Sequence, residues 1–198
     1  MARIDYFFST LSPFTYLAGT RLEEIAARHG AEVVYKPFGI AKIFEVVGTP
    51  AVPNRHDSKK VYRTQELMRI SKRAGLPITL QPMYWPTNPV PSMSAIIAAQ
   101  SAGGGDVGGL THGLMRACWA EEKDIAEDAV IIECLEANGF DGKLVNAGML
   151  SGSETIERNT NEAVERGVFG APTYLVDDQV FWGQDRIEHL DRYLSKQS

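Results

Sequence analysis

Hydrophobic residues at the start of the chain are spaced first as in a strand and then as in a helix. Residues 5–8 form a short apolar run, and a turn of three or four residues leads to Ser12 and Pro13. Serine is a good N-cap and proline is favoured at the first helical position, so this pair predicts a helix start. Apolar residues then recur every three or four positions as far as Gly30, which predicts one continuous helix.

Residues 31–36 return to a strand pattern, which Pro37 ends. A strand, a helix and a second strand within so few residues imply parallel pairing with a right-handed crossover.

From residue 37 to about residue 167 the pattern is helical and is interrupted by prolines and glycines. The predicted helices cover residues 57–74, 92–101, 107–121, 127–138 and 153–166. Residues 81–91 hold four prolines, which remove backbone donors and fix φ, so this segment predicts a loop. Its Trp85 either lines a pocket or packs over the core.

The last part of the chain returns to strands. Residues 168–176 predict a strand entered through Pro172, and residues 180–182 predict the strand that follows it. Asp185 with Glu188 resembles a capping box and predicts a final helix. Two strands near each end, with helices between them, predict an α/β core interrupted by an all-helical insertion.

Composition narrows the class of protein. The chain has 198 residues, a formal net charge of -5 and a pI near 5.4, which argues against nucleic acid or an anionic membrane as a partner. The first residues enter a strand directly and no apolar run approaches the length of a bilayer span, so we expect a cytoplasmic protein. Cys118 and Cys134 fall in helical patterns, which suits reduced core thiols. The four histidines lack metal-ligand spacing, so each is expected at a surface or helix end and no metal is predicted.

The order of the predicted elements resembles the thioredoxin fold with an inserted helical domain, as in the DsbA group. This resemblance implies a thioredoxin-like domain of residues 1–36 and 168–198 and a helical insertion of residues 37–167. Redox members carry Cys-x-x-Cys where this chain has Ser12-Pro13-Phe14-Thr15. Because both sulfurs are absent, disulfide exchange at this turn is excluded.

Four motifs together are similar to the 2-hydroxychromene-2-carboxylate isomerase family, which is related to the kappa-class glutathione transferases. They are residues 12–18, 53–55, 168–173 and 181–186. The resemblance implies a glutathione-dependent isomerase of aromatic-compound catabolism that interconverts 2-hydroxychromene-2-carboxylate and trans-o-hydroxybenzylidenepyruvate. Glutathione is the implied cofactor, an aromatic carboxylate the implied substrate and a homodimer the implied assembly.

The resemblance also assigns residues to a glutathione site. Ser12 would donate a hydrogen bond to the glutathione thiolate, and a cis Pro172 would let the backbone of Ala171 pair with the tripeptide. Backbone groups at Trp182-Gly183-Gln184-Asp185 would receive the γ-glutamyl carboxylate, while Asp185 pairs with its ammonium group. The alternatives are a simple N-cap at Ser12, a trans proline that begins an edge strand, and a plain helix cap at Asp185.

A second group of residues is assigned by the resemblance to the aromatic substrate. Asn54 and Arg55 would contact it, since a planar guanidinium suits a carboxylate, and Trp85 would stack on its ring. A solvated loop arginine is the alternative for Arg55. Lys42 and Phe44 are also assigned to the substrate site. Some family members carry a lysine where this chain has Phe44, although Lys42 is close in sequence.

Two other functions use the same sequence features. A kappa-like glutathione S-transferase or peroxidase would consume glutathione at the same thiolate site. A non-catalytic thioredoxin-fold binding module would have only a degenerate Ser12-x-x-Thr15 turn.

Overall fold

A four-stranded mixed sheet, with the strand order β2-β1-β3-β4, forms the centre of the computed structural model, which describes residues 1–147 and 149–196. β1 (Arg3–Phe8) pairs in parallel with β2 (Glu32–Pro37), as the sequence predicts. β3 (Thr173–Val176) runs antiparallel to β1, and β4 (Gln179–Trp182) runs antiparallel to β3. The two ends of the chain therefore build one sheet, and the thioredoxin-like fold is confirmed. The predicted division into two domains stays a prediction, and residues 197 and 198 of its last segment lie outside the described residues.

The strand predicted over residues 168–176 is shorter in the structure, because β3 begins only at Thr173. Pro172 has no N–H group to donate to a ladder, so a strand can begin after it but not continue through it. Before it, the backbone N–H of Val168 donates to Ala163 of the preceding helix. Residues 168–172 therefore form part of the connection between the preceding helix and β3.

The single helix predicted from Ser12 to Gly30 is wrong, because the structure has two helices there. α1 (Pro13–Tyr16) is one turn long, and α2 (Arg21–His29) follows after a break at Gly19, which has a φ of +61°. A residue with a Cβ rarely adopts this φ, so glycine allows the chain to change direction between the two helices.

The helices predicted in the middle of the chain are confirmed, with boundaries shifted by a few residues. They are α4 (Asp57–Ala74), α5 (Val90–Ala102), α6 (Val107–Trp119), α7 (Asp128–Ala137) and α9 (Met149–Glu165). The sequence did not predict α3 (Ile40–Val46), the 3-10 turn Val52–Asn54 or α8 (Leu144–Ala147), which are too short to show a periodic pattern. The predicted loop is confirmed for residues 81–89, while Val90 and Pro91 belong to the first turn of α5.

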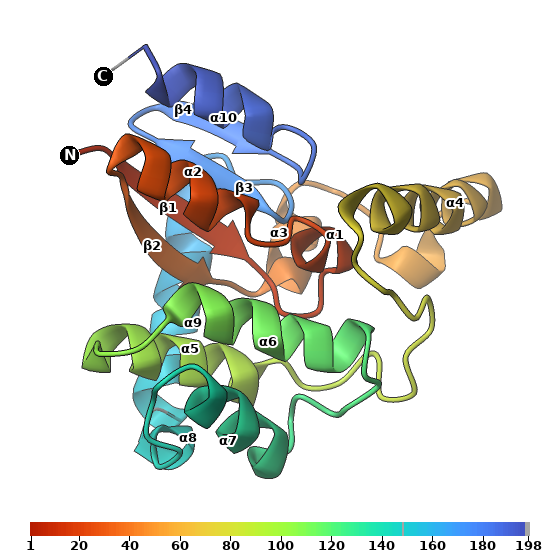
Figure 1. Cartoon of the computed structure of the whole chain (residues 1–198). Helices are drawn as coiled ribbons and strands as arrows, with labels where there is room; N and C mark the ends of the chain where they lie inside the picture. The colour runs from red at the N-terminus through yellow and green to blue at the C-terminus, as the bar shows by residue number, and fades with distance from the viewer. Residues whose placement is uncertain (148, 197–198) are drawn as a thin grey trace.

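Helices cover both faces of the sheet (Figure 1). Tyr6 and Phe8 of β1 pack into a cluster formed with α2, α5, α6, α7 and α10 (Ile187–Leu194), and Phe7 points into the opposite cluster beside α3 and α9. α4 extends to one side, beyond the other helices. Within the described residues, no helix is both long and apolar enough to cross a membrane.

An ion-pair network joins β1, β2 and α9 on the Phe7 side of the sheet. Asp5 is 7% exposed, and its carboxylate lies 3.4 Å from the Lys36 ammonium and next to the Arg166 guanidinium. Glu162 of α9 pairs with both of these cations. Lys36 and Arg166 each pair with Asp5 of β1 and with Glu162 of α9, so the network joins β1 to α9.

Candidate active site

Two hollows open side by side where the start of α1 faces α4 and the connection before β3. The inner hollow, of about 770 Å³, includes Ser12 in its lining, and the outer hollow, of about 640 Å³, includes Asp185. Six residues line both of them: Phe14, Arg55, Lys59, Arg63, Ala171 and Trp182. Because the hollows share these walls, they form one continuous cleft.

Ser12 is placed in the inner hollow by the turn that ends β1. It is the N-cap of α1, and its Oγ accepts a hydrogen bond from the backbone N–H of Thr15 at 3.2 Å. The Oγ also lies 3.5 Å from the carbonyl oxygen of Ala171, at the limit for a donated hydrogen bond. The hydroxyl is therefore an N-cap that also faces a cleft. Since α1 has one turn only, its dipole is weaker than that of the long helix the sequence predicts.

The connection before β3 forms the next wall of the cleft. The Ala171–Pro172 peptide bond is cis, which confirms the prediction for Pro172. Pro172 itself is buried, and Ala171 is half-buried on both hollows. Gly170 lies under Trp182, since a Cβ at position 170 would stand 2.5 Å from the indole Nε1. A larger residue at position 170 would therefore displace the Trp182 ring.

Residues 182–185 leave β4 and line the outer hollow. Gly183 has a φ of +104°, and its N–H donates to the carbonyl of Pro172 at 2.8 Å, which ties this turn to the cis bond. Asp185 is exposed and its carboxylate lies 3.2 Å from the Arg186 guanidinium. The predicted capping box at Asp185 is wrong: the turn closed by the N–H of Arg186 on Gly183 comes first, and α10 starts only at Ile187.

Gln184 is held from behind by α2. Its side chain is buried, and its Oε1 accepts a hydrogen bond from Nη2 of Arg21 at 3.0 Å. The same guanidinium donates to the carbonyls of Leu17 and Ala18, which follow α1, at 3.2 and 2.8 Å. One cation thus connects the end of the Ser12 helix to the segment that lines the outer hollow.

Three of the residues assigned to the substrate line the inner hollow, namely Phe44, Arg55 and Trp85. The Arg55 guanidinium lies 5.4 Å from the centre of the Phe44 ring, within cation–π range, and its Nε donates to the carbonyl of Pro50. Trp85 donates from Nε1 to the carbonyl of Leu11 at 3.3 Å and packs against Trp119. Both readings of Trp85 therefore hold, because it faces the hollow and covers the core.

Lys42 and Asn54 are not brought to the cleft. The side chain of Lys42 is 63% exposed and pairs with Glu45 on α3, and Asn54 is an exposed residue of the 3-10 turn. Neither is among the described residues that line the inner or the outer hollow.

Of the six residues that line both hollows, the sequence analysis assigned no site role to three: Phe14, Lys59 and Arg63. The Arg63 guanidinium lies 5.8 Å from the centre of the Phe14 ring. Burial, together with the charge of Arg55, lowers the pKa of Arg63 below its usual value, yet guanidinium remains charged in proteins. The four-residue spacing of Lys59 and Arg63 places both on one face of α4, which is a signal that the sequence did contain.

The two thiols lie outside the cleft. Cys118 and Cys134 are not disulfide-bonded, and burial raises the pKa of Cys118 to about 12 and that of Cys134 to about 11. Both are therefore unreactive thiols at neutral pH, as predicted.

The histidines are dispersed, and one of them differs from its prediction. His112 is not at a surface but packs against the Tyr16 ring, and burial lowers its pKa. The others serve locally, as where His29 pairs with Asp191 and His56 caps α4. No group of three or more histidine, cysteine, aspartate or glutamate side chains is placed to hold a metal in the part of the chain that the structure describes.

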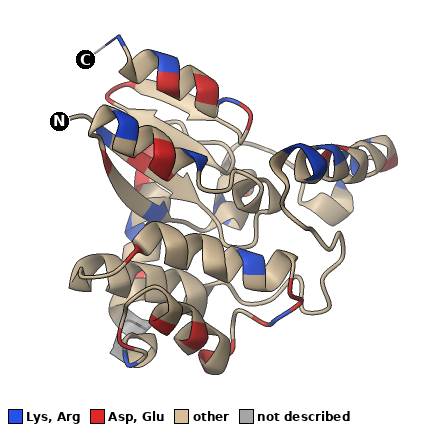
Figure 2. Ribbon diagram, in the orientation of Figure 1, with Lys and Arg blue, Asp and Glu red and all other residues tan. Residues whose placement is uncertain are grey.

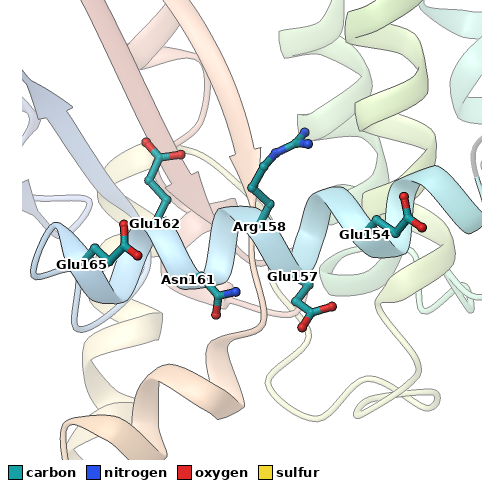
Figure 3. Close-up of a pocket in the computed structure, with 6 residues that line it drawn as sticks. All are labelled: Glu154, Glu157, Arg158, Asn161, Glu162 and Glu165. Atoms are coloured by element: carbon teal, nitrogen blue, oxygen red, sulfur yellow. The ribbon is translucent and has the colours of Figure 1, made fainter.

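A third hollow, of about 340 Å³, runs along α9 (Figure 3). It is lined by Glu154, Glu157, Arg158, Asn161, Glu162 and Glu165. These side chains project from a single helix, and Glu162 already belongs to the ion-pair network of the sheet. Because its lining comes from the charged surface of one helix, this hollow is not a candidate active site. The cleft at Ser12 remains the candidate site.

Comparison with known proteins agrees with this fold. The family model described as DSBA-like thioredoxin domain matches residues 3–195. A 2-hydroxychromene-2-carboxylate isomerase of Sphingobium xenophagum is 29% identical over 194 residues, which are 96% of this chain and 97% of that protein. Glutathione S-transferase kappa 2 of Caenorhabditis elegans is 23% identical over 98% of this chain and 92% of its own length. A solved 2-hydroxychromene-2-carboxylate isomerase structure superposes with a TM-score of 0.78 at 24% identity, over 98% of this chain and 95% of that chain. These matches confirm the resemblance that the four sequence motifs indicated.

Proposed function

The chain belongs to the DSBA-like thioredoxin domain family, and from this premise we propose that it is a glutathione-dependent isomerase of aromatic 2-oxo acids. The reaction proposed is the interconversion of 2-hydroxychromene-2-carboxylate and trans-o-hydroxybenzylidenepyruvate. The observation that carries the proposal is that a hydroxyl, in place of a cysteine thiol, faces a cleft with aromatic and cationic walls. The isomerase relatives, which align over nearly the whole chain, support the same class of reaction.

The residues of the cleft suit glutathione. An extended tripeptide laid along Ala171 would have its thiol near Ser12 and its γ-glutamyl end near Asp185, since Ala171 lines both hollows. The Asp185 carboxylate suits an ammonium group, and the Lys59 ammonium suits a carboxylate. The names of the kappa-class relatives, which are glutathione transferases, support this choice of cofactor.

Ser12 is the catalytic residue of the proposal. Its Oγ already accepts from the N–H of Thr15, and among the described residues the acceptor recorded for its own proton is the carbonyl of Ala171, 3.5 Å away. That proton is therefore available for a bound thiolate, which a hydrogen-bond donor stabilises and whose pKa it lowers. The one-turn helix α1 adds little, so the nearby cations Arg55, Lys59 and Arg63 supply most of the positive potential.

The chemistry that glutathione supplies when bound is reversible thiol addition across a conjugated double bond, which allows rotation before the addition is reversed. The protein holds the substrate for this chemistry. Phe44 and Trp85 offer flat surfaces to its ring, and Arg55 offers a planar partner to its carboxylate.

The test is a spectroscopic assay of the interconversion with glutathione, without it, and with Ser12→Ala. We expect a rate that requires glutathione and falls at least about tenfold in Ser12→Ala, because one charge-assisted hydrogen bond is lost. Asp106→Ala is the matched control, since it removes an N-cap of α6 that bonds Gly109 at 2.9 Å in a part of the fold outside the cleft. Equal rates with and without glutathione would contradict the proposal.

A kappa-like transferase is the second candidate, and the 23% identical kappa-class relatives support it. It would use the same Ser12 site but consume glutathione. A conjugate that accumulates in stoichiometric amount, with no turnover of the benzylidenepyruvate isomer, would select the transferase.

A further inference from the structure

Two arginines from different segments line the same cleft. Arg55 directly follows the 3-10 turn, and Arg63 lies nearly two turns after the first residue of α4. Both residues are half-buried and line both hollows. Each guanidinium lies over an aromatic ring, Arg55 over Phe44 at 5.4 Å and Arg63 over Phe14 at 5.8 Å. Each ring attracts the cation that lies over it, so the two cation–π contacts favour these positions of the guanidiniums.

The charges around these arginines are not balanced. Two carboxylates line the outer hollow, and each has a cation of its own: Glu66 pairs with Arg69 at 3.3 Å, and Asp185 pairs with Arg186. Across the described residues, no carboxylate lies within 4.0 Å of the guanidinium of Arg55 or Arg63. Figure 2 shows the surrounding excess of Lys and Arg on α4, which carries six of them against two acidic residues.

Two like charges in one cleft repel each other, and burial adds to the cost. Both effects lower the pKa of Arg63, with burial the larger. An anion between the guanidiniums would remove the repulsion and would replace the lost hydration with planar, bidentate hydrogen bonds.

We propose that Arg55 and Arg63 form an anion clamp for the carboxylate of a flat, apolar ligand. The site residue that this adds is Arg63, as the determinant that selects an acid over a neutral compound of the same shape. This assignment rests on the proposed function, because the ligand is the aromatic carboxylate substrate of the proposed isomerase reaction. The Phe14 and Phe44 rings beneath the clamp continue into the inner hollow toward Trp85, where a flat ring can lie.

Glutathione carries carboxylates too, so the test separates the two sources. Isothermal titration calorimetry without glutathione measures the affinity for trans-cinnamate and for cinnamamide, which has the same ring and chain but no charge. We expect the wild-type protein to prefer the acid, and Arg63→Gln to weaken acid binding about tenfold or more with little effect on the amide. Arg63→Lys should fall between them, because a lysine keeps the charge but not the fork.

Lys72→Gln is the matched control. It removes a cation from the same helix, at a side chain that is exposed and lines neither hollow. We expect its affinity for trans-cinnamate to match that of the wild type. Thermal unfolding checks that each variant is folded. If Arg63→Gln does not fold, the affinity of a folded Arg63→Lys protein for trans-cinnamate decides whether Arg63 binds the carboxylate.

Several results would overturn the clamp. Equal binding of acid and amide by the wild type would do so, as would an Arg63→Gln protein that keeps its affinity for the acid. If Arg63→Gln weakened the binding of glutathione alone, Arg63 would bind a carboxylate of the tripeptide. That result would overturn the assignment of Arg63 to the second substrate. The isomerase assay separates this inference from the proposed function. Glutathione-dependent turnover with an unchanged substrate KM in Arg63→Gln would refute the clamp alone. Acid-selective binding by a wild-type protein without turnover would refute the reaction alone.

Discussion

The Arg21 guanidinium offers the sharpest test of how the two halves of the cleft are held together. Arg21→Ala removes hydrogen bonds to the carbonyls of Leu17 and Ala18 and to the side chain of Gln184. The first two fix the chain after the Ser12 helix, and the third fixes the segment that lines the outer hollow. The substitution should therefore affect glutathione binding without touching a residue that contacts the reacting atoms.

The size of the effect follows from burial. Gln184 is 4% exposed, so its amide oxygen loses its partner in a place where water cannot easily replace it. An unsatisfied buried acceptor costs about 1–3 kcal/mol, so we expect the free energy of unfolding to fall by about 2 kcal/mol. If half of that loss also appears in the binding of glutathione, its KM rises by roughly fivefold, while kcat changes little because Ser12 is retained.

The assay combines steady-state kinetics with a double-mutant cycle. Arg21→Ala and Gln184→Ala should show a coupling energy of about 1 kcal/mol in unfolding, since the two side chains share one hydrogen bond. Arg28→Ala is the control on the same helix, because Arg28 is exposed and pairs with Asp191 at 2.8 Å, so that its loss costs less than about 1 kcal/mol. A coupling energy near zero, or the same glutathione KM in Arg21→Ala and Arg28→Ala, would refute the reasoning.

Two further predictions concern the sheet and the wall of the cleft. The pKa of Asp5 is lowered, because the hydrogen bond from Arg166 and the charge of Lys36 outweigh the effect of burial. Its stabilisation is therefore present above its unfolded pKa of about 3.9 and is lost as the pH falls through the folded value. Asp5→Asn should lower the unfolding free energy by about 2 kcal/mol at pH 7 and flatten its decline between about pH 5 and 2, and parallel wild-type and variant curves would contradict this. Gly170→Ala should displace the Trp182 ring, because a Cβ at position 170 would stand 2.5 Å from the indole Nε1. We expect the glutathione KM to rise severalfold and the midpoint of urea unfolding to stay nearly unchanged. An unaltered KM would show that glutathione binding does not need the ring.

Much of the fold could be predicted because the signals were local. α4 begins and ends at the predicted residues, since an apolar stripe lies before Gly75, which takes the left-handed C-cap with a φ of +67°. The break between α1 and α2 could not be seen, because the stripe of apolar residues continues across Gly19 and an isolated glycine is compatible with a helix. α3 was missed for the opposite reason, since its only buried residue, Ile43, makes no periodic pattern.

The same distinction between local and tertiary signals decides which site residues could be predicted. Ser12 and Ala171 could be placed from motifs, because each lies next to a proline with a fixed position in the fold. Arg63 belongs to no motif, and its role depends on which face of α4 turns toward Phe14, which only tertiary packing determines. Lys42 shows the converse, since it is close to Phe44 in sequence but points along α3 to Glu45, away from the cleft.

The short α1 changes where the positive potential of the site must come from. In a long helix the aligned peptide dipoles act at the N-terminus, but one turn sums only a few of them. A thiolate near Ser12 therefore depends on the hydroxyl for direction and on the cations of α4 and the 3-10 turn for charge. The sheet and the cis bond supply position, while Arg55, Lys59 and Arg63 supply the positive charge. Substitutions in α4 should thus alter the pKa of the bound thiol, and those in β1 should alter stability first.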